Sequence, residues 1–298
     1  LELASRAVAA MGVREATVDP EMPVAVADRL RADGIVLHVD DKAIAARRRA
    51  KSAPELAGVR RAQAAAEAGM RAAAELLRRA GTDGGRLMVD GEVLTAESVR
   101  AAVRDACQAR GAPAPPDIIV SSPWSGFGHD PGSGPLPAAL PIVIDLWPRD
   151  EESGCWADMT RTFVVGEVSE QVRAMEALVL EAIERAREAV APGITGRELY
   201  DLVCDVFEPA GYRTQRTERA EDPMEGFQFA LGHGVGLALH EPPGLGRTGH
   251  GPLVAGDVIA IEPGLWVREI GEVRFEDLLL VTEDGGETLT QYPYDLSP

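Results

Sequence analysis

The sequence predicts an α+β fold, and three observations favour this class. The chain has 298 residues, of which 45% are hydrophobic, so it can build a sizeable core in one large domain or two ordinary ones. Beyond residue 50, pairs of helical segments are followed by strand-rich segments. This order of elements occurs twice, which indicates a weak internal duplication. Two helical hairpins of similar length are the simpler alternative.

Residues 1–50 resemble part of a small α/β unit. The stretch AVADRLRADG is expected to form a short helix that ends at Gly34, and IVLHVDD is expected to form a strand. The basic stretch AARRRAKSAPELAG is interrupted by Pro54 and is expected to be a linker. The predicted domains are therefore 1–50 and 51–298. Because the first residue is Leu1 rather than Met, the chain is expected to start inside a longer gene product.

Four helices are expected in residues 51–298. The second starts after Thr95, the third covers 169–190, and the fourth starts after Thr195, with Glu198 completing a capping box. The first covers 55–80, and its apolar residues recur every three or four positions, which is typical of an amphipathic helix. These residues are Leu56, Val59, Ala62, Ala66, Met70, Ala73 and Leu77.

The composition argues against several classes of protein. A net charge of −18 is unfavourable for a nucleic-acid-binding protein. No apolar run has transmembrane length and no signal pattern is present, so no membrane association is expected. Cys107, Cys155 and Cys204 are widely spaced without a CxxC pair, which argues against a disulfide framework or a zinc–thiolate site. We therefore expect a reducing, cytoplasmic location.

Four apolar segments are expected to be strands, and each carries an acidic residue. They are residues 141–147, 158–166, 257–266 and 272–282. A carboxylate in such a segment is costly unless it is paired or binds a metal. Asp145 and Asp158 flank a charged loop, so we expect a hairpin in which they face each other across adjacent strands. The alternative is that each is a turn residue next to a strand.

The other two acidic segments contain glutamates. Glu262 stands where an apolar strand reaches the bend Pro263-Gly264. Glu276 lies within VRFEDLLLV, and a period of two places Arg274 on the same face, where the cation would limit repulsion between carboxylates. The alternative is that Arg274 and Glu276 form a common surface ion pair.

The segment LGHGVGLALHEPPGLG contains two of the five histidines, His233 and His240. With the two aspartates and two glutamates they form a candidate metal site. Four carboxylates carry a formal charge of −4, which two divalent cations would neutralise. Oxygen-rich ligation with an imidazole suits Mn, Co, Fe or Zn. Two such ions would lie about 3.5–4 Å apart and hold a bridging hydroxide.

These motifs resemble the pita-bread metallopeptidases, which include Xaa-Pro aminopeptidase, prolidase and methionine aminopeptidase. The resemblance covers roughly residues 50–298 and rests on Asp145, Asp158 followed by MTRT, GHGVGLALH, IEPG and VRFEDLLLVT in that order. It implies a pita-bread (creatinase/aminopeptidase) fold, with pseudo-twofold αβ repeats around a curved, mainly antiparallel sheet. Residues 1–50 would then be the last part of a small α/β N-terminal domain.

The resemblance also assigns a role to each metal ligand. Asp145 would chelate one metal, and Asp158 and Glu276 would bridge both. His233 and Glu262 would complete the coordination of the second metal. Two divalent ions are therefore implied, with Mn²⁺ preferred and Co²⁺, Fe²⁺ or Zn²⁺ as alternatives.

Five residues receive roles in catalysis or support. His240 would contact the substrate and stabilise the tetrahedral intermediate, and His129 in SGFGHDPGSG would lie near the scissile bond. Glu262 would also influence proton transfer. Arg274 matches an arginine that supports the ligands, and Thr160 is expected to hydrogen-bond a ligand carboxylate, because it lies two residues beyond Asp158.

The segments IDLWPRD, MTRTFVVG and VRFEDLLLVT resemble Xaa-Pro peptidases more than methionine aminopeptidases. The implied function is hydrolysis of an N-terminal Xaa-Pro bond in peptides with proline at the second position, by a homodimer. A methionine-aminopeptidase-like enzyme, another hydrolase and a non-catalytic peptide-binding module are the alternatives. Trp266 replaces a tyrosine of many relatives and Phe229 a histidine of some, so substrate choice near the pocket is expected to differ.

Overall fold

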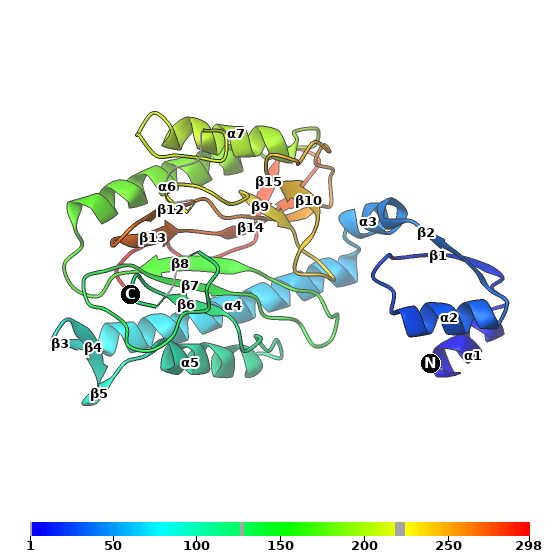
Figure 1. Cartoon of the computed structure of the whole chain (residues 1–298), viewed down its shortest axis with the longest axis horizontal. Coiled ribbons are helices and arrows are strands. Elements are labelled where there is room, and N and C mark those ends of the chain that lie inside the picture. Colours follow the sequence, from blue (N-terminus) through cyan, green and yellow to red (C-terminus); the bar gives the residue numbers. More distant parts are fainter. Residues whose placement is uncertain (1, 126–127, 218–223) are drawn as a thin grey trace. The chain divides into compact units, whose positions relative to one another are not determined.

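The computed structural model describes residues 2–125, 128–217 and 224–298. Its chain divides into two compact units, Leu1–Ala50 and Lys51–Pro298 (Figure 1). That residues 1–50 are the end of a larger domain stays a prediction.

The smaller unit is an α/β unit with a two-stranded sheet. Strand β1 pairs in parallel with β2, with Glu15 opposite Val36. Residues 41–49 form a helix, so the expectation that the linker includes 45–49 is wrong. The side chain of Asp40 caps this helix by accepting hydrogen bonds from two backbone N–H groups. The elements are α1 (Glu2–Ala10), β1 (Glu15–Val18), α2 (Val24–Ala32), β2 (Val36–Val39) and α3 (Asp41–Arg49).

The larger unit contains the four expected helices. They are α4 (Ala53–Arg79), α5 (Ala96–Gln108), α6 (Glu170–Ala189) and α7 (Gly196–Phe207). The capping box of α7 is confirmed, because Thr195 N donates to Glu198 Oε2 at 2.8 Å and Glu198 N donates to Thr195 Oγ1 at 3.2 Å. Leu56 of the predicted α4 stripe is half-buried and the other stripe residues are fully buried, so this stripe faces the core.

The strands of this unit pair antiparallel. The three-stranded sheet β6-β7-β8 belongs to the first helix–strand repeat, and the five-stranded sheet β10-β9-β11-β14-β15 belongs to the second. The pair β12-β13 and the three-stranded sheet β3-β4-β5 are separate from these two sheets. The strands are β3 (Gly81–Asp83), β4 (Arg86–Val89), β5 (Glu92–Val93), β6 (Ile119–Ser121), β7 (Ile142–Leu146), β8 (Met159–Phe163), β9 (Gly232–Gly234), β10 (Glu241–Leu245), β11 (Val258–Ile261), β12 (Gly264–Val267), β13 (Gly271–Arg274), β14 (Asp277–Val281) and β15 (Gly286–Thr288).

Two predicted strands are each divided into two. The segment 257–266 becomes β11 and β12, interrupted at Glu262 and Pro263, and 272–282 becomes β13 and β14, interrupted at Phe275 and Glu276. Proline cannot donate a ladder hydrogen bond, which explains the first break. At the second break, Glu276 N donates to Thr160 O on β8 instead, at 3.1 Å. Both breaks release a glutamate from the regular ladders.

The helices cover the strands in two pairs. Figure 1 shows α4 and α5 along one side of the strands and α6 and α7 along the other. One apolar cluster joins α4 and α5 to β6, β7 and β8, and another joins α6 and α7 to β11, β12, β13 and β14. Each half therefore builds its own core from two helices and the strands that follow them, as the predicted αβ repeat requires.

Two further observations bear on the chemistry of this chain. The three cysteines are all buried and none forms a disulfide, in agreement with the prediction from their spacing. None of the helices in the described residues is both long enough and apolar enough to cross a membrane.

Candidate metal centre

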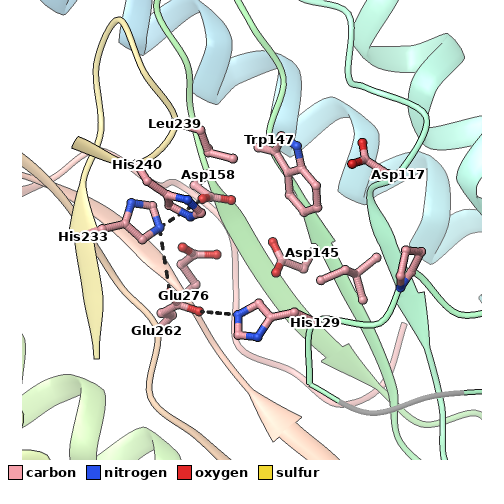
Figure 2. A pocket seen from close by; sticks show the side chains of 12 residues that line it. Asp117, His129, Asp145, Trp147, Asp158, His233, Leu239, His240, Glu262 and Glu276 are labelled. Carbon is pink, nitrogen blue, oxygen red and sulfur yellow. Dashed lines mark ion pairs between the residues drawn. The ribbon is translucent and has the colours of Figure 1, made fainter. Parts of the chain in front are cut away.

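The two aspartates come from the hairpin β7–β8. Asp145 lies on β7 directly opposite Thr160, and Asp158 immediately precedes β8. Asp158 is therefore two residues from the partner of Asp145 and lies diagonally on the same face of the sheet. The two aspartates are offset by two positions across the adjacent strands β7 and β8, and both side chains face one cavity (Figure 2).

The two glutamates reach this cavity from the strand breaks. Glu262 follows β11, and Glu276 lies between β13 and β14. Both are buried. Thr160 Oγ1 on β8 donates a hydrogen bond to Glu276 Oε2 at 2.8 Å. This bond fixes one carboxylate oxygen of Glu276 relative to the hairpin that carries the two aspartates. The backbone bond between Glu276 and Thr160 holds the same two segments together.

His233 lies on β9, where the backbone passes very close to its neighbours. A Cβ atom at Gly232 would overlap the carbonyl oxygen of Ala260, and one at Gly234 would lie 2.5 Å from the carbonyl oxygen of Pro242. Glycine is required at both positions, because any side chain would push β9 away from β11 or β10. The two glycines therefore allow the imidazole between them to approach the carboxylates.

The imidazole of His233 presents Nε2 to the carboxylates. Its Nδ1 lies 3.1 Å from the carbonyl oxygen of Gly234, which can only accept a hydrogen bond, so we assign the proton to Nδ1. Nε2 lies 3.5 Å from Asp158 Oδ2 and 3.8 Å from Glu262 Oε1. Asp158, His233 and Glu276 each offer one atom, and these atoms lie within 4.8 Å of one another, a grouping that can hold a metal ion.

The protonation equilibria of this cluster reflect crowding of negative charge. Burial raises the pKa of Asp158 and Glu276 well above the ordinary values, and the neighbouring carboxylates raise them further. Burial also raises the pKa of Glu262 to about 8. Burial, helped by His240, lowers the pKa of His233 to about 4, so its imidazole is neutral at pH 7, the form that binds metals. Divalent cations would relieve this repulsion.

Arg274 is a buried cation beside these carboxylates, but its partners differ from the expected one. It donates through Nη2 to Asp145 Oδ2 at 2.9 Å and through Nη1 to Glu272 Oε1 at 3.1 Å, rather than to Glu276. Among the described residues, none hydrogen-bonds the buried Asp145 Oδ1, an orphaned acceptor that suits a cation ligand. The sequence prediction missed Glu272, although the alternation that groups Arg274 with Glu276 also includes it.

Two more histidines line the cavity from its exposed side. His129 Nε2 lies 4.0 Å from Glu262 Oε2, and its ring meets Phe229 edge-on at 5.6 Å. The His240 ring meets the His233 ring edge-on at 4.1 Å. All predicted metal ligands and both histidines therefore line one cavity of about 230 Å³. Residues 126–127 of the His129 motif lie outside the described residues.

The protein from which EDTA has removed any metal (called chelated protein below) is expected to lose stability as the pH rises from 6.5 to 8. In this window the folded state keeps a proton on Glu262, whose pKa is about 8, while the unfolded chain has released it. The free energy of unfolding therefore falls by up to about 1.4 kcal/mol per pH unit for this group. His233 does not oppose the trend, because its lowered pKa costs stability only below pH 6.5. Urea unfolding in EDTA at both pH values measures the change, and equal stability would contradict it.

Comparisons with known proteins agree with this geometry. The model of metallopeptidase family M24 matches residues 57–283. Xaa-Pro dipeptidase from Pyrococcus furiosus is 36% identical over 185 residues, which are 62% of this chain and 49% of that relative. A second Xaa-Pro dipeptidase, from Pyrococcus horikoshii, is 37% identical over 52% of this chain and 40% of its own. The chain thus spans about half the length of the curated relatives it matches.

Solved structures show the same fold. The prolidase from Pyrococcus horikoshii has a TM-score of 0.80 at 28% identity, over 98% of this chain and 78% of that one. The X-Pro aminopeptidase from Thermotoga maritima has a TM-score of 0.82 at 23% identity, over 99% and 78%. These likenesses confirm the predicted α+β pita-bread fold. The family model matches more than half of the residues of this chain, so the chain belongs to metallopeptidase family M24.

Proposed function

We propose that this chain is a dinuclear metal-dependent peptidase that hydrolyses the N-terminal Xaa-Pro bond of peptides. The observation that carries the proposal is the convergence of Asp158, His233 and Glu276 within 4.8 Å, with Asp145 and Glu262 lining the same cavity. A prolidase and an X-Pro aminopeptidase share the fold, and an Xaa-Pro dipeptidase is 36% identical to this chain, which supports proline at the second position of the substrate.

The residues present fit two divalent cations. In the proposal, Asp145 would hold one ion, His233 and Glu262 would hold the other, and Asp158 and Glu276 would be ligands shared by the two. When bound, the ions supply a nucleophilic hydroxide and polarise the scissile carbonyl. An oxygen-rich set with one imidazole favours Mn²⁺, with Co²⁺, Fe²⁺ or Zn²⁺ as alternatives.

The side chains of this chain orient the peptide and handle protons. The free N-terminal amine of the substrate would lie near Asp145 and the metal that Asp145 would hold. His129 and His240 orient the scissile group from the exposed side of the cavity, and His240 stabilises the tetrahedral intermediate. Glu262 Oε2, which faces His129 Nε2 at 4.0 Å, is placed to hold a proton during the reaction.

Proline must be recognised by shape, because a prolyl amide has no N–H to donate. Phe229 lies behind this site: its ring packs edge-on against His129, and its centroid is 5.7 Å from the guanidinium carbon of Arg274. An apolar ring therefore stands where some relatives carry a histidine. Trp266, which replaces a tyrosine, is half-buried on β12, with its backbone paired to Gly226. Neither substitution removes a proposed metal ligand.

One assay tests the activity. We expect the chelated protein to be inactive and Mn²⁺ to restore release of the N-terminal residue from Ala-Pro or Ala-Pro-Ala, but not from Met-Ala-Ser. A comparison of the dipeptide with the tripeptide then distinguishes dipeptidase from aminopeptidase activity. Cleavage of Met-Ala-Ser would instead indicate a methionine-aminopeptidase-like enzyme. No cleavage of any peptide by protein with two bound metals would refute the peptidase proposal in favour of a binding module.

The proposal extends to the assembly and the location of the protein. We infer a homodimer in the cytoplasm, as the sequence resemblance and the cysteine pattern imply. Light scattering coupled to gel filtration tests the dimer, for which a mass near twice 31.7 kDa is expected.

A further inference from the structure

One part of the cavity, called the arm below, is lined by residues that have no role in the proposed hydrolysis. Its walls are Asp117, Ile119 and Trp147, which line the same cavity as the metal-site residues. Figure 2 shows Asp117 on the far side of Asp145 from His233, with the Trp147 ring between Asp117 and Asp158. The arm therefore extends away from the cluster of candidate ligands along the sheet β6-β7-β8.

Strand register explains why these side chains share one face. Ile119 pairs with Asp145, and Asp145 pairs with Thr160. Asp117 lies in the turn that leads to β6, Trp147 directly follows β7 and Asp158 directly precedes β8, so all three stand just beyond the same end of these paired strands. Neighbouring strands lie about 4.8 Å apart, so β6, which carries Ile119, is roughly 10 Å from β8 across the sheet. A peptide group at the metals, followed by one long side chain, spans such a distance.

The chemistry of the arm suits a long cation. Asp117 is exposed, and within the described part of the chain no Lys, Arg or His side chain forms an ion pair with it. Ile119 and the half-buried Trp147 provide apolar surface for an aliphatic stem. An indole face also attracts a cation, and Arg or Lys is the usual partner. A neutral or acidic side chain would gain nothing from the carboxylate at the end of the arm.

The position of the arm points to the first residue of the substrate. In the proposed mode the free amine lies at Asp145, and Trp147 is two residues beyond Asp145 on the same face. The side chain attached next to that amine is therefore the nearest to the arm.

We propose that Asp117 and Trp147 form a subsite for the side chain of the first residue and favour peptides that begin with Lys or Arg before proline. This inference rests on the proposed function and adds the class of its preferred substrate. Asp117 is a specificity-determining residue in this scheme and takes no part in bond cleavage.

The test compares Lys-Pro-Ala with norleucyl-Pro-Ala, whose stem is similar but uncharged, in the Mn²⁺-loaded full chain. We expect kcat/KM to be about fivefold higher for the lysyl peptide, the scale of a partly exposed ion pair. Asp117→Asn should reduce this ratio to about one. The matched control Asp105→Asn, an exposed aspartate on α5, should keep it. Added salt should lower the ratio in the unaltered protein.

The outcomes separate this inference from the proposed function. A ratio that Asp117→Asn does not change would overturn the subsite, and so would a preference for lysine in Ala-Pro-Lys rather than in Lys-Pro-Ala. If no peptide is cleaved, the proposed function fails. Calorimetric titration of the protein with the two tripeptides then measures their affinities and tests the subsite independently of activity. Tighter binding of the lysyl peptide that Asp117→Asn abolishes would support the subsite, and equal binding would overturn it.

Discussion

Hydrolysis of Ala-Pro peptides is expected to fall far more than about 100-fold when Glu276 is replaced by glutamine. That factor is typical of losing a group that only supports a metal ligand, whereas Glu276 is proposed to bind both metals itself. The amide keeps the shape of the side chain and can still accept the hydrogen bond from Thr160 Oγ1. Lost activity would therefore report lost charge and metal ligation. Steady-state kinetics and metal content after dialysis measure both effects.

The matched control for this substitution is Glu283→Gln, at an exposed glutamate in the turn after β14. It should leave activity and metal content unchanged. Glu276→Gln should also make the chelated protein more stable at pH 8, because it removes a buried carboxylate whose pKa is raised well above its ordinary value. Full activity with two bound metals in Glu276→Gln would refute the assignment of Glu276 as a ligand.

Local patterns predicted the helices and the residues of the site. The stripe on α4 and the capping box of α7 depend only on neighbours within a few positions, and both are found in the structure. The acidic residues that interrupt apolar strands pointed to the cavity in the same way, because a buried carboxylate is rarely accidental. The glycines around His233 are explained only by the structure, in which a Cβ atom at Gly232 or Gly234 would collide with a neighbouring strand.

Features that depend on strand pairing were harder to predict. Whether 257–266 is one strand or two depends on which segments lie beside it, and the backbone bond from Glu276 to Thr160 joins residues far apart in the sequence. The register of β6, β7 and β8 likewise decides that Ile119 stands opposite Asp145 and Asp145 opposite Thr160. The helix at residues 41–49 was missed because its basic composition was interpreted as a linker, although Asp40 is a recognisable N-cap.

Replacement of Arg274 by methionine is expected to lower the free energy of unfolding by about 3–5 kcal/mol at pH 8 in chelated protein. Methionine fills much of the buried space but leaves Asp145 and Glu272 without their shared cation. Urea unfolding measures the loss. Arg78→Met, at an exposed arginine on α4, is the matched control and should change stability by less than about 0.5 kcal/mol.

The pH dependence of this loss distinguishes charge from packing. Arg274 lowers the pKa of Glu262, Glu272 and Glu276, so its removal raises those values further. Carboxylates with raised pKa values favour the folded state while they hold protons and destabilise it once they ionise. The variant should therefore lose more stability than the parent between pH 6.5 and 8. A loss that is the same at both pH values would show that Arg274 acts only through packing.

A second substitution locates the partner that matters. Glu272→Gln added to Arg274→Met should recover part of the lost stability, because one of the two uncompensated carboxylates becomes neutral. Glu272→Gln alone should lower the free energy of unfolding by less than Arg274→Met does, because Arg274 still hydrogen-bonds Asp145. The two effects should therefore be non-additive, as expected for residues in one hydrogen-bonded network. Additive effects would instead mean that Arg274 stabilises the fold through its bond to Asp145, a proposed metal ligand, and not through its bond to Glu272.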